Sequence, residues 1–395
     1  MHLDLDAFFV EVCRREDPAL RDVELLVVGG RRTSRGVVQS ASYGARAFGV
    51  RSGMPIAEAV RRCPRATFVQ GTFASYRAAS RAVQAVLTQH APVVVMVGLD
   101  EGYLDYSGTD LLHPVSLLGA ATALRRAVHE ATQLDCSIGI GPNRTIAKIA
   151  SDYAKPRGIC EVRAGWERRF LAGLPLKALP GIGPKTAERL AALGLTDVIQ
   201  VQETPEEELV RLLGRDAAVA LARRASGAGG TSVRPRTRAR SVSRETTFSR
   251  DLSDSEALDR VLVLLTARIG AQLRDEQLVA GAIVLKLRFA DFRTITRRLT
   301  LPEASADDLI IRETARALLQ AARTEPRARG APIRLLGVGT VNLLEAPLGD
   351  LFSGAAPPGR TEVTSALDAV RAKYGFDALR PGRLVRRPPR ARPDD

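Results

Sequence analysis

Two acidic clusters in the chain contain side chains that could share one metal site. Asp4 and Asp6 flank Leu5 near the amino terminus, and Asp100 and Glu101 follow an apolar run. An unpaired carboxylate in such strand-like sequence is costly to bury, so a neutralising partner is expected. Mg²⁺ binds carboxylate oxygens, and a pair of Mg²⁺ ions can organise a phosphoryl transfer. We therefore predict one site that holds two Mg²⁺ ions, for which Mn²⁺ would substitute.

The first cluster alone has a simpler interpretation. On a strand, Asp4 and Asp6 share a face, while Leu5 points away and offers its backbone carbonyl. A single Asp-x-Asp pair is more often a solvated strand edge than a metal site. The second cluster favours the metal site, because Asp100 and Glu101 could both face one ion pair if they lie at a strand end or turn.

The composition indicates a multidomain protein with a polyanionic partner. The chain has 395 residues, 45% of them hydrophobic, which is enough for several separate cores. Its formal net charge of +14 favours nucleic acid as a partner ahead of an anionic membrane surface. No apolar run has the length of a membrane span and no signal peptide is evident, so we expect a cytoplasmic protein without a membrane partner. The four scattered cysteines form no CxxC pair, and we expect reduced, mostly buried thiols.

Hydrophobic periodicity places both acidic clusters in one α+β unit. Residues 3–10 alternate charge and bulk as a strand does, and helical and loop-like sequence then runs to about residue 72. A helix at 74–90 leads into a strand at 93–97, which ends at the second cluster. Strands interleaved with helices predict a mixed domain that positions the acids. The later elements expected in this unit are a helix at 116–133, a strand at 136–140 and a helix to 154.

The remainder of the chain has a different organisation. Residues 174–227 predict short helices, and residues 230–241, with alternating arginines, predict a flexible basic linker. A separate small α+β domain is expected at 242–346, and the Pro- and Arg-rich tail at 347–395 is expected to be partly disordered. The elements predicted in the small domain are a helix at 255–276, strands at 283–289 and 294–301, a helix at 305–323 and a strand at 333–343.

The acidic clusters and several longer motifs together resemble the Y-family DNA polymerases of the DinB, or polymerase IV, type. Residues 41–55 (ASYGARAFGVRSGMP) resemble the fingers motif, and the segments 136–143, 147–151 and 154–158 resemble a later block of the palm. The resemblance spans almost the whole chain and implies a multidomain α+β right-hand polymerase fold. In that fold, the palm would comprise 1–11 and 73–163, the small fingers 12–72, a helix-hairpin-helix thumb 164–229, and a little finger 242–346, after the linker at 230–241.

The resemblance also implies roles for the acidic residues. Asp4, Asp100 and Glu101 match the family's catalytic carboxylates, which bind the two metal ions. The Leu5 carbonyl matches a further metal ligand, whereas Asp6 matches a position that supports the site without ligating a metal.

Residues at the nucleotide are implied in the same way. Phe9, beside Phe8, matches the steric gate that leaves no room for a 2′-hydroxyl, although core packing would explain it equally well from sequence alone. Tyr43, Arg46 and Lys155 match groups that hold the nucleotide's triphosphate. Three positions depart from the family pattern, because Gly44, Gly98 and Gly102 stand where Glu, Ser and Ala are common.

DNA contacts are predicted in two further places. Residues 179–187 resemble a helix-hairpin-helix turn, in which Gly181 and Gly183 let the backbone approach a phosphate and Lys185 adds charge. The alternative for this motif is a tight turn between two packed helices. In the distal domain, a basic sheet face is predicted to lie along a duplex backbone, formed by Lys286, Arg288, Arg293, Arg297 and Arg298.

The resemblance implies a template-directed, low-fidelity DNA polymerase of translesion synthesis, with primer–template DNA and dNTPs as partners. Two alternatives are a non-catalytic, polymerase-like DNA-binding adaptor and a helix-hairpin-helix repair protein with a scaffolding amino-terminal half. The presence of all three carboxylates argues against the first, and the paired acidic clusters are unexplained by the second. Residues 348–352 keep only the Leu-Phe end of a sliding-clamp peptide, which makes clamp binding a weak prediction, and nothing argues against a monomer.

Overall fold

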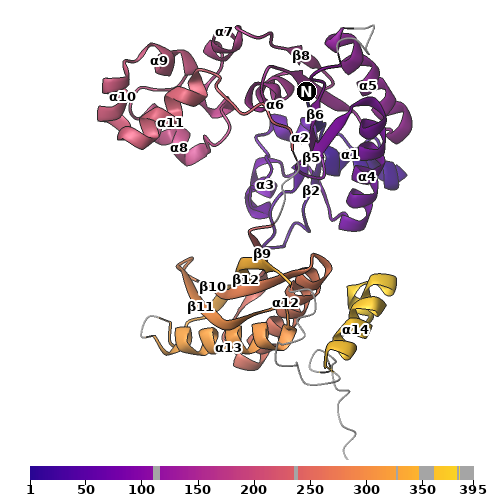
Figure 1. The fold of residues 1–395 in the computed structure, drawn as a ribbon, viewed down its shortest axis with the longest axis vertical. Helices are drawn as coiled ribbons and strands as arrows, with labels where there is room; N and C mark the ends of the chain where they lie inside the picture. The colour runs from indigo at the N-terminus through magenta and orange to yellow at the C-terminus, as the bar shows by residue number, and fades with distance from the viewer. Residues whose placement is uncertain (110–115, 235–238, 326–327, 347–359, 380–381, 383–395) are drawn as a thin grey trace, which may run out of the picture. The chain divides into compact units, whose positions relative to one another are not determined.

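The computed structural model describes two compact units, Met1–Pro235 and Arg236–Asp395, which are treated separately below (Figure 1). It describes all residues except 110–115, 235–238, 326–327, 347–359, 380–381 and 383–395. The clamp-like residues 348–352 therefore lie outside the described part. Within that part, no helix is long and apolar enough to cross a membrane.

The centre of the first unit is a five-stranded sheet in the order β5-β6-β1-β7-β8, in which β1 pairs antiparallel with both β6 and β7. Alternation along β1 sends Leu3 and Leu5 into the main core, which the helices α4 and α5 also line. His2 and Asp4 face the opposite side, where α6 packs. The strands are β1 (His2–Leu5), β5 (Val93–Met96), β6 (Glu101–Asp105), β7 (Cys136–Ile140) and β8 (Ile159–Glu161).

Three helices of this sheet domain, α4, α5 and α6, confirm the helices expected from the hydrophobic periodicity. The helices are α1 (Phe8–Glu16), α4 (Phe73–His90), α5 (Leu117–Thr132) and α6 (Arg144–Tyr153), and a short 3-10 turn, η1 (Pro18–Leu20), follows α1. Serine, threonine and asparagine side chains cap three of these helices by accepting a backbone N–H, as N-cap residues do. All four cysteines are free thiols and three of them are buried, as expected.

The predicted strand at 3–10 is wrong beyond Leu5. Residues Asp6 and Ala7 form a turn, in which Ala7 has a left-handed backbone with a φ of 46°, and α1 begins at Phe8. The sharp turn ends the alternation, so Asp6 does not share a strand face with Asp4. Its consequence is that a strand end, a turn and a helix amino terminus meet at the acidic cluster.

Residues 26–69 form a small subdomain with its own core, which sequence periodicity did not reveal. Its three strands pair in the order β3-β2-β4, and each is only two or three residues long, too short for an alternating pattern. Its elements are β2 (Leu26–Val28), β3 (Ser40–Ala41), α2 (Tyr43–Ala47), α3 (Ile56–Arg62) and β4 (Thr67–Val69).

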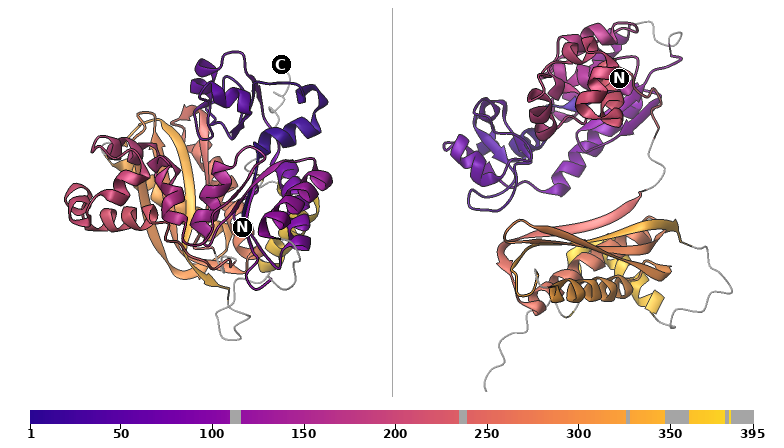
Figure 2. Two further views of the ribbon diagram at one scale, coloured as in Figure 1. Left: turned by 90° about the horizontal axis from the view of Figure 1, so that it is seen from above. Right: turned by 90° about the vertical axis from the view of Figure 1, so that its left-hand side faces the viewer.

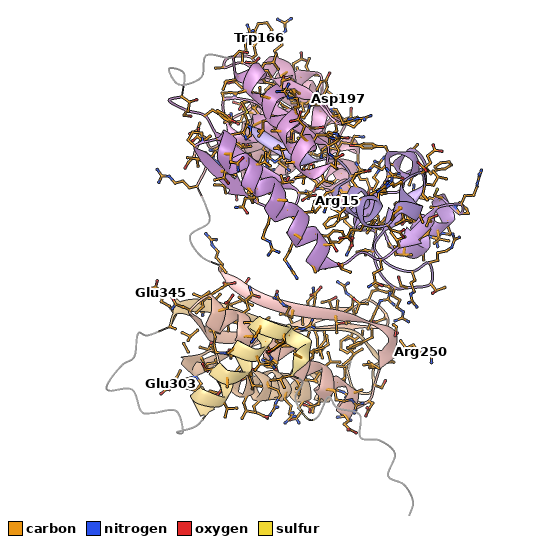
Figure 3. All side chains as sticks on the ribbon, turned by 90° about the vertical axis from the view of Figure 1, so that its right-hand side faces the viewer. Arg15, Trp166, Asp197, Arg250, Glu303 and Glu345 are labelled. Carbon is orange, nitrogen blue, oxygen red and sulfur yellow. The ribbon has the colours of Figure 1, made fainter. Side chains whose placement is uncertain are left out.

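A cluster of short helices follows, as predicted for residues 174–227, and packs a separate core that also includes apolar residues of α6. The lone tryptophan of the chain, Trp166, caps α7 and is about half-exposed at the surface (Figure 3). The elements are α7 (Glu167–Ala172), η2 (Leu176–Ala178), α8 (Pro184–Ala191), α9 (Val198–Glu203), α10 (Glu206–Leu213) and α11 (Arg215–Ala225).

The second unit is an antiparallel four-stranded sheet in the order β11-β10-β12-β9, with α12 and α13 packed on one face (Figures 1 and 2). The predicted helix–hairpin–helix–strand order is confirmed, but the edge strand β9 was not anticipated. Its charged and hydroxyl residues carry little apolar alternation. The elements are β9 (Ser241–Leu252), α12 (Ser255–Asp275), β10 (Leu278–Phe289), β11 (Thr294–Ser305), α13 (Asp308–Thr324) and β12 (Ile333–Glu345).

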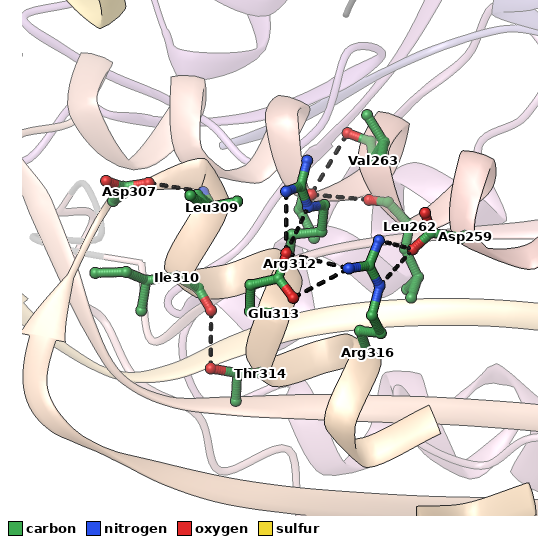
Figure 4. Close-up of polar contacts among 11 residues, drawn as sticks. Asp259, Leu262, Val263, Asp307, Leu309, Ile310, Arg312, Glu313, Thr314 and Arg316 are labelled. Carbon is green, nitrogen blue, oxygen red and sulfur yellow. Dashed lines mark hydrogen bonds and ion pairs between the residues drawn. The ribbon is translucent and has the colours of Figure 1, made fainter. Parts of the chain in front are cut away.

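Polar contacts also join α12 to α13 beside the apolar core. Arg316 of α13 donates to Asp259 Oδ1 of α12 from Nε at 2.7 Å and from Nη2 at 2.5 Å, and its Nη1 lies 3.1 Å from Glu313 Oε2 (Figure 4). Such a forked contact fixes the position of one helix along the other.

The tail at 347–395 contains a helix that the sequence did not predict, α14 (Arg360–Tyr374), which precedes the turn η3 (Phe376–Ala378). Arg274 of α12 binds Asp368 of α14 through Nε at 2.6 Å, and its Nη1 binds Asp308 of α13 at 2.8 Å. Arg371 of α14 is buried, and its guanidinium lies over the Phe376 ring. The long-range ion pairs that fix this helix cannot be read from the local composition of the tail.

We expect Arg274→Met to loosen α14. The change leaves the carboxylates of Asp308 and Asp368 without their shared partner and should cost about 1–3 kcal/mol of local stability. Hydrogen exchange of α14 peptides in the full chain measures this effect. Arg260→Met, on the same helix, removes an exposed pair with Glu256 and should change exchange little. Equal protection of α14 in wild type and Arg274→Met would contradict the assignment.

Candidate active site

The sheet register brings the two acidic clusters together. Asp4 on β1 is directly opposite Glu101 on β6, and the Leu5 N–H donates to the Asp100 carbonyl at 2.8 Å. Asp100 lies in the bend before β6 and Glu101 is the first residue of that strand, as expected for a pair at a strand end. Asp4, Asp100 and Glu101 therefore meet at one edge of the sheet domain.

Two lysines pair with two of these carboxylates, those of Asp4 and Glu101. Lys155 Nζ lies 2.9 Å from Asp4 Oδ1 and 2.8 Å from Asp152 Oδ1, and Lys148 Nζ forms an ion pair with Glu101 Oε2. Within the described ranges, no three acidic, histidine or cysteine side chains are already arranged around a common point as metal ligands. Asp4 and Glu101 are thus each held by a lysine side chain.

Burial and pairing affect the three acids differently. Burial raises the pKa values of Asp4 and Asp100, because it penalises the ionised form, and Asp100 is further raised by the neighbouring Glu101 charge. The adjacent His2 and Lys148 side chains lower the pKa of Glu101 to about 2. An added positive charge would therefore stabilise the ionised forms of Asp4 and Asp100.

The Asp6 carboxylate is held by hydrogen-bond donors from three parts of the first unit. Its carboxylate accepts hydrogen bonds from Ser137 Oγ at 3.1 Å, from the Arg157 N–H at 2.8 Å and from the Tyr43 hydroxyl at 3.0 Å. With these donors around it, the buried carboxylate is oriented by the protein and joins β1, β7 and α2.

The two phenylalanines that follow the turn have different surroundings. Phe8 is 2% exposed and belongs to the core, whereas Phe9 is half-buried. The Phe9 ring meets the buried Tyr76 ring edge to face, with centroids 4.5 Å apart. Phe9 therefore has a rigid backing on one side and a partly open surface on the other.

Tyr43 and Arg46 share one face of α2, as expected from their spacing. The Arg46 guanidinium lies 4.8 Å from the centre of the Tyr43 ring, and its Nε donates to the Ala41 carbonyl at 2.9 Å. Burial, with the nearby Asp6 charge, raises the pKa of Tyr43 to about 12, so the phenol remains a neutral donor. Asp4, Asp100 and Glu101 are called the acidic edge below. Tyr43 lies near it through its hydrogen bond to Asp6, and Lys155 lies at it through its ion pair with Asp4.

Two of the three glycine departures, Gly98 and Gly102, lie beside Asp100 and Glu101. A Cβ added at Gly98 would lie 3.2 Å from Asp100 Oδ1, and one at Gly102 would lie 2.9 Å from Met96 Sδ. A Cβ at Gly44 would lie 2.9 Å from the Glu24 carbonyl. Side chains at these positions would thus crowd their neighbours, which fits the glycines found here.

Sequence reasoning missed His2 and Lys148. His2 is fully buried, with Nε2 3.4 Å from Glu101 Oε2 and Nδ1 2.7 Å from Ser151 Oγ. A signal for Lys148 existed, because Arg144, Lys148 and Lys155 recur at helical spacing on the segment that packs over β1.

The predicted DNA-contacting residues fall into two groups that lie in different units. In the first unit, Gly181 adopts a φ of 87° and Gly183 caps α8, and Lys185 is exposed in the first turn of that helix. In the second unit, strand register places Lys286, Arg288 and Arg298 on the sheet face opposite the helices, because their cross-strand partners alternate with the core leucines of β10.

Arg297 does not belong to the predicted basic face, and Arg293 lies between β10 and β11, outside both strands. Arg297 is opposite the core residue Leu285 and pairs with Glu325 at the end of α13, with Nη2 2.5 Å from Oε1. The guanidinium of Arg293 lies 4.7 Å from the centre of the core Phe289 ring. A strand alternates its faces, so adjacent arginines cannot all face the same way.

Three parts of the chain match known family descriptions. Residues 3–152 match the impB/mucB/samB family, residues 239–350 match the C-terminal domain of that family, and residues 167–195 match the IMS family HHH motif. A DNA polymerase IV of Dehalococcoides mccartyi (strain CBDB1) is 38% identical over 98% of this chain and 97% of its own. A DNA polymerase IV of Caulobacter vibrioides is 35% identical over 98% of this chain and 94% of its own.

Solved structures agree with these matches. A Y-family DNA polymerase chimera of Dbh and Dpo4 superposes with a TM-score of 0.74 at 25% identity, covering 87% of this chain and 98% of the chimera. An insertion ternary complex of Dbh DNA polymerase, with the same identity and coverage, gives a TM-score of 0.60. The chain therefore belongs to the impB/mucB/samB family of Y-family DNA polymerases, which includes the DNA polymerase IV proteins.

Proposed function

We infer that the protein is a template-directed, low-fidelity DNA polymerase of translesion synthesis, which transfers a nucleotide to a primer 3′-hydroxyl. The observation that carries this inference is the meeting of Asp4, Asp100 and Glu101 at one sheet edge, with Tyr43 and Lys155 beside them. A non-catalytic adaptor would have no need to keep three partly buried acids close together at a free-energy cost.

The donor set fits divalent metal ions. Three carboxylates and the Leu5 carbonyl are the hard oxygen ligands that Mg²⁺ prefers, and burial of Asp4 and Asp100 favours added positive charge. We propose that these groups hold two Mg²⁺ ions, or Mn²⁺ in their place. When bound, such ions lower the pKa of an attacking hydroxyl and neutralise a leaving pyrophosphate.

The other site residues would bind and orient the nucleotide. Lys155, now paired with Asp4, would move to the triphosphate, and Arg46 and the neutral Tyr43 hydroxyl would donate to phosphate oxygens. Asp6 keeps Tyr43 in place through the hydrogen bond between them. Phe9, backed by Tyr76, would lie under the sugar and exclude a 2′-hydroxyl.

Both units would contact the duplex. The α8 amino terminus, with Gly181, Gly183 and Lys185, would bind the DNA phosphate backbone without reading sequence. The sheet face that carries Lys286, Arg288 and Arg298 would lie along another stretch of the duplex backbone. We propose palm, fingers, thumb and little finger with the boundaries expected from the sequence, acting as a cytoplasmic monomer. Sliding-clamp binding through residues 348–352 belongs to the same proposal.

Substitutions of two neighbouring arginines on β11 should affect different properties of the protein. Arg298→Ala should weaken DNA binding and reduce the slope of log affinity against log salt by about 0.9, because one phosphate contact is lost. Arg297→Ala should leave that slope unchanged and instead lower stability, because Glu325 loses its partner. Fluorescence anisotropy over a salt series measures the slopes. A lower slope for Arg297→Ala would contradict the face assignment.

Primer extension tests the proposed function. Wild-type protein with dNTPs and Mg²⁺ should extend a primer on an undamaged template and past a template lesion. Folded protein that binds the primer–template but extends nothing with Mg²⁺ or Mn²⁺ would overturn the polymerase assignment and favour the adaptor.

A further inference from the structure

Three cations on α6 and the turn after it each face a different group of the sheet. The Arg144 guanidinium lies 4.4 Å from the centre of the Tyr103 ring. Lys148 pairs with Glu101, and Lys155 pairs with Asp4. The proposed function gives Lys155 a second partner, the triphosphate, but gives Lys148 none. The role of Lys148 therefore has to be found in its contact with Glu101.

Lys148 supplies a full positive charge to Glu101 in a partly desolvated setting. The two side chains are 29% and 26% exposed. His2 lies on the buried side of this pair, with its Nε2 3.4 Å from the same Oε2 atom.

We propose that Lys148 is an internal counter-ion that competes with a divalent cation for Glu101 and so sets the affinity of the acidic edge for that cation. This inference rests on the proposed function, since it concerns the same carboxylates. An ammonium group and a metal ion of like charge cannot share one carboxylate oxygen at contact distance without mutual repulsion. The cation must therefore displace Lys148 to bind Glu101.

Removing the Lys148 charge should change metal affinity in one direction if Lys148 competes with the metal, and in the other direction if its role is structural. If Lys148 held Glu101 in a metal-ready position, its removal would weaken metal binding. If Lys148 competes, its removal leaves Glu101 with one less positive charge nearby and tightens metal binding. Lys148→Met removes the charge and keeps most of the apolar stem, whereas Lys148→Arg keeps the charge.

Mn²⁺ binding without DNA or nucleotide tests the proposal, with free Mn²⁺ read from its electron paramagnetic resonance signal. We expect Lys148→Met to lower the Kd by about fivefold or more, and Lys148→Arg to stay within about twofold of wild type. Lys177→Met, a matched loss of charge at an exposed position, should also stay near wild type. An unchanged or raised Kd for a folded Lys148→Met protein would overturn the proposal.

A second measurement uses the wild-type chain and does not depend on the folding of a variant. Acetylation of lysines, followed by peptide mass spectrometry, reports how available each amine is. Mn²⁺ should raise the acetylation rate of Lys148 about threefold as its amine leaves Glu101, and should leave Lys177 unchanged. An equal rate with and without Mn²⁺ would show that Lys148 is not displaced and would overturn the proposal.

The outcomes also separate this proposal from the proposed function. Mn²⁺ binding by wild type that is lost in Asp100→Asn supports the acidic edge as a metal site. If that pattern holds while Lys148→Met binds Mn²⁺ as wild type does, only the counter-ion proposal fails. If wild type binds no Mn²⁺, or if Asp100→Asn binds Mn²⁺ as wild type does, the metal site itself is contradicted. The counter-ion proposal then fails with it.

Discussion

Replacing Asp100 by asparagine should lower the rate of primer extension by at least about a thousandfold while leaving DNA binding intact. The substitution keeps the shape of the side chain but removes a negative charge at the point where both acidic clusters meet. Asparagine is a poor ligand for Mg²⁺ beside two carboxylates, so the charge that organises the transfer would be incomplete. Single-turnover extension of a labelled primer measures the loss.

Stability gives the Asp100→Asn variant an independent check. Burial raises the pKa of Asp100 in the folded chain, so protonation favours the fold and the ionised form at neutral pH opposes it. The neutral asparagine should therefore unfold at a temperature no lower than wild type. Asp105→Asn, at the other end of β6, is the matched control and should keep its activity. More than a tenth of wild-type extension by Asp100→Asn would contradict a catalytic role.

Replacing Phe9 by alanine should admit ribonucleotides, with the preference for dNTPs over rNTPs falling by about a hundredfold. The Phe9 ring is half-buried at the start of α1, next to the turn that carries Asp6, and Tyr76 supports it from behind. A ring with such backing cannot easily move aside for a 2′-hydroxyl, whereas alanine leaves space. Steady-state incorporation of matched dNTP and rNTP on one template gives the ratio.

Phe8→Ala is the control for this experiment, because the two rings are neighbours with different exposure. Phe8 is 2% exposed, and its truncation should cost about 3–5 kcal/mol of stability without admitting ribonucleotides. Phe9→Ala should lose less stability, since part of its surface already faces solvent. If Phe9→Ala rejects rNTPs as strictly as wild type, another residue must limit the sugar.

The long helices and the composition of the acidic clusters were predictable because their signals are local. The predicted helices at 74–90 and 116–133 match α4 and α5 closely, and α12 and α13 were equally recognisable. Each repeats its apolar spacing over several turns, so the pattern exceeds chance. Strands of two or three residues in the 26–69 subdomain carry too few residues for such a pattern.

The sequence by itself determined which side chains were available for chemistry, namely three carboxylates and a set of lysines and arginines, and it also determined the long helices. Only the tertiary structure decided their partners. The register of β1 on β6 sets Asp4 opposite Glu101, the packing of α6 brings Lys148 to Glu101, and strand alternation separates Arg297 from Arg298. Such pairings join residues far apart in the chain, and their energies depend on burial and distance, which local sequence patterns do not contain.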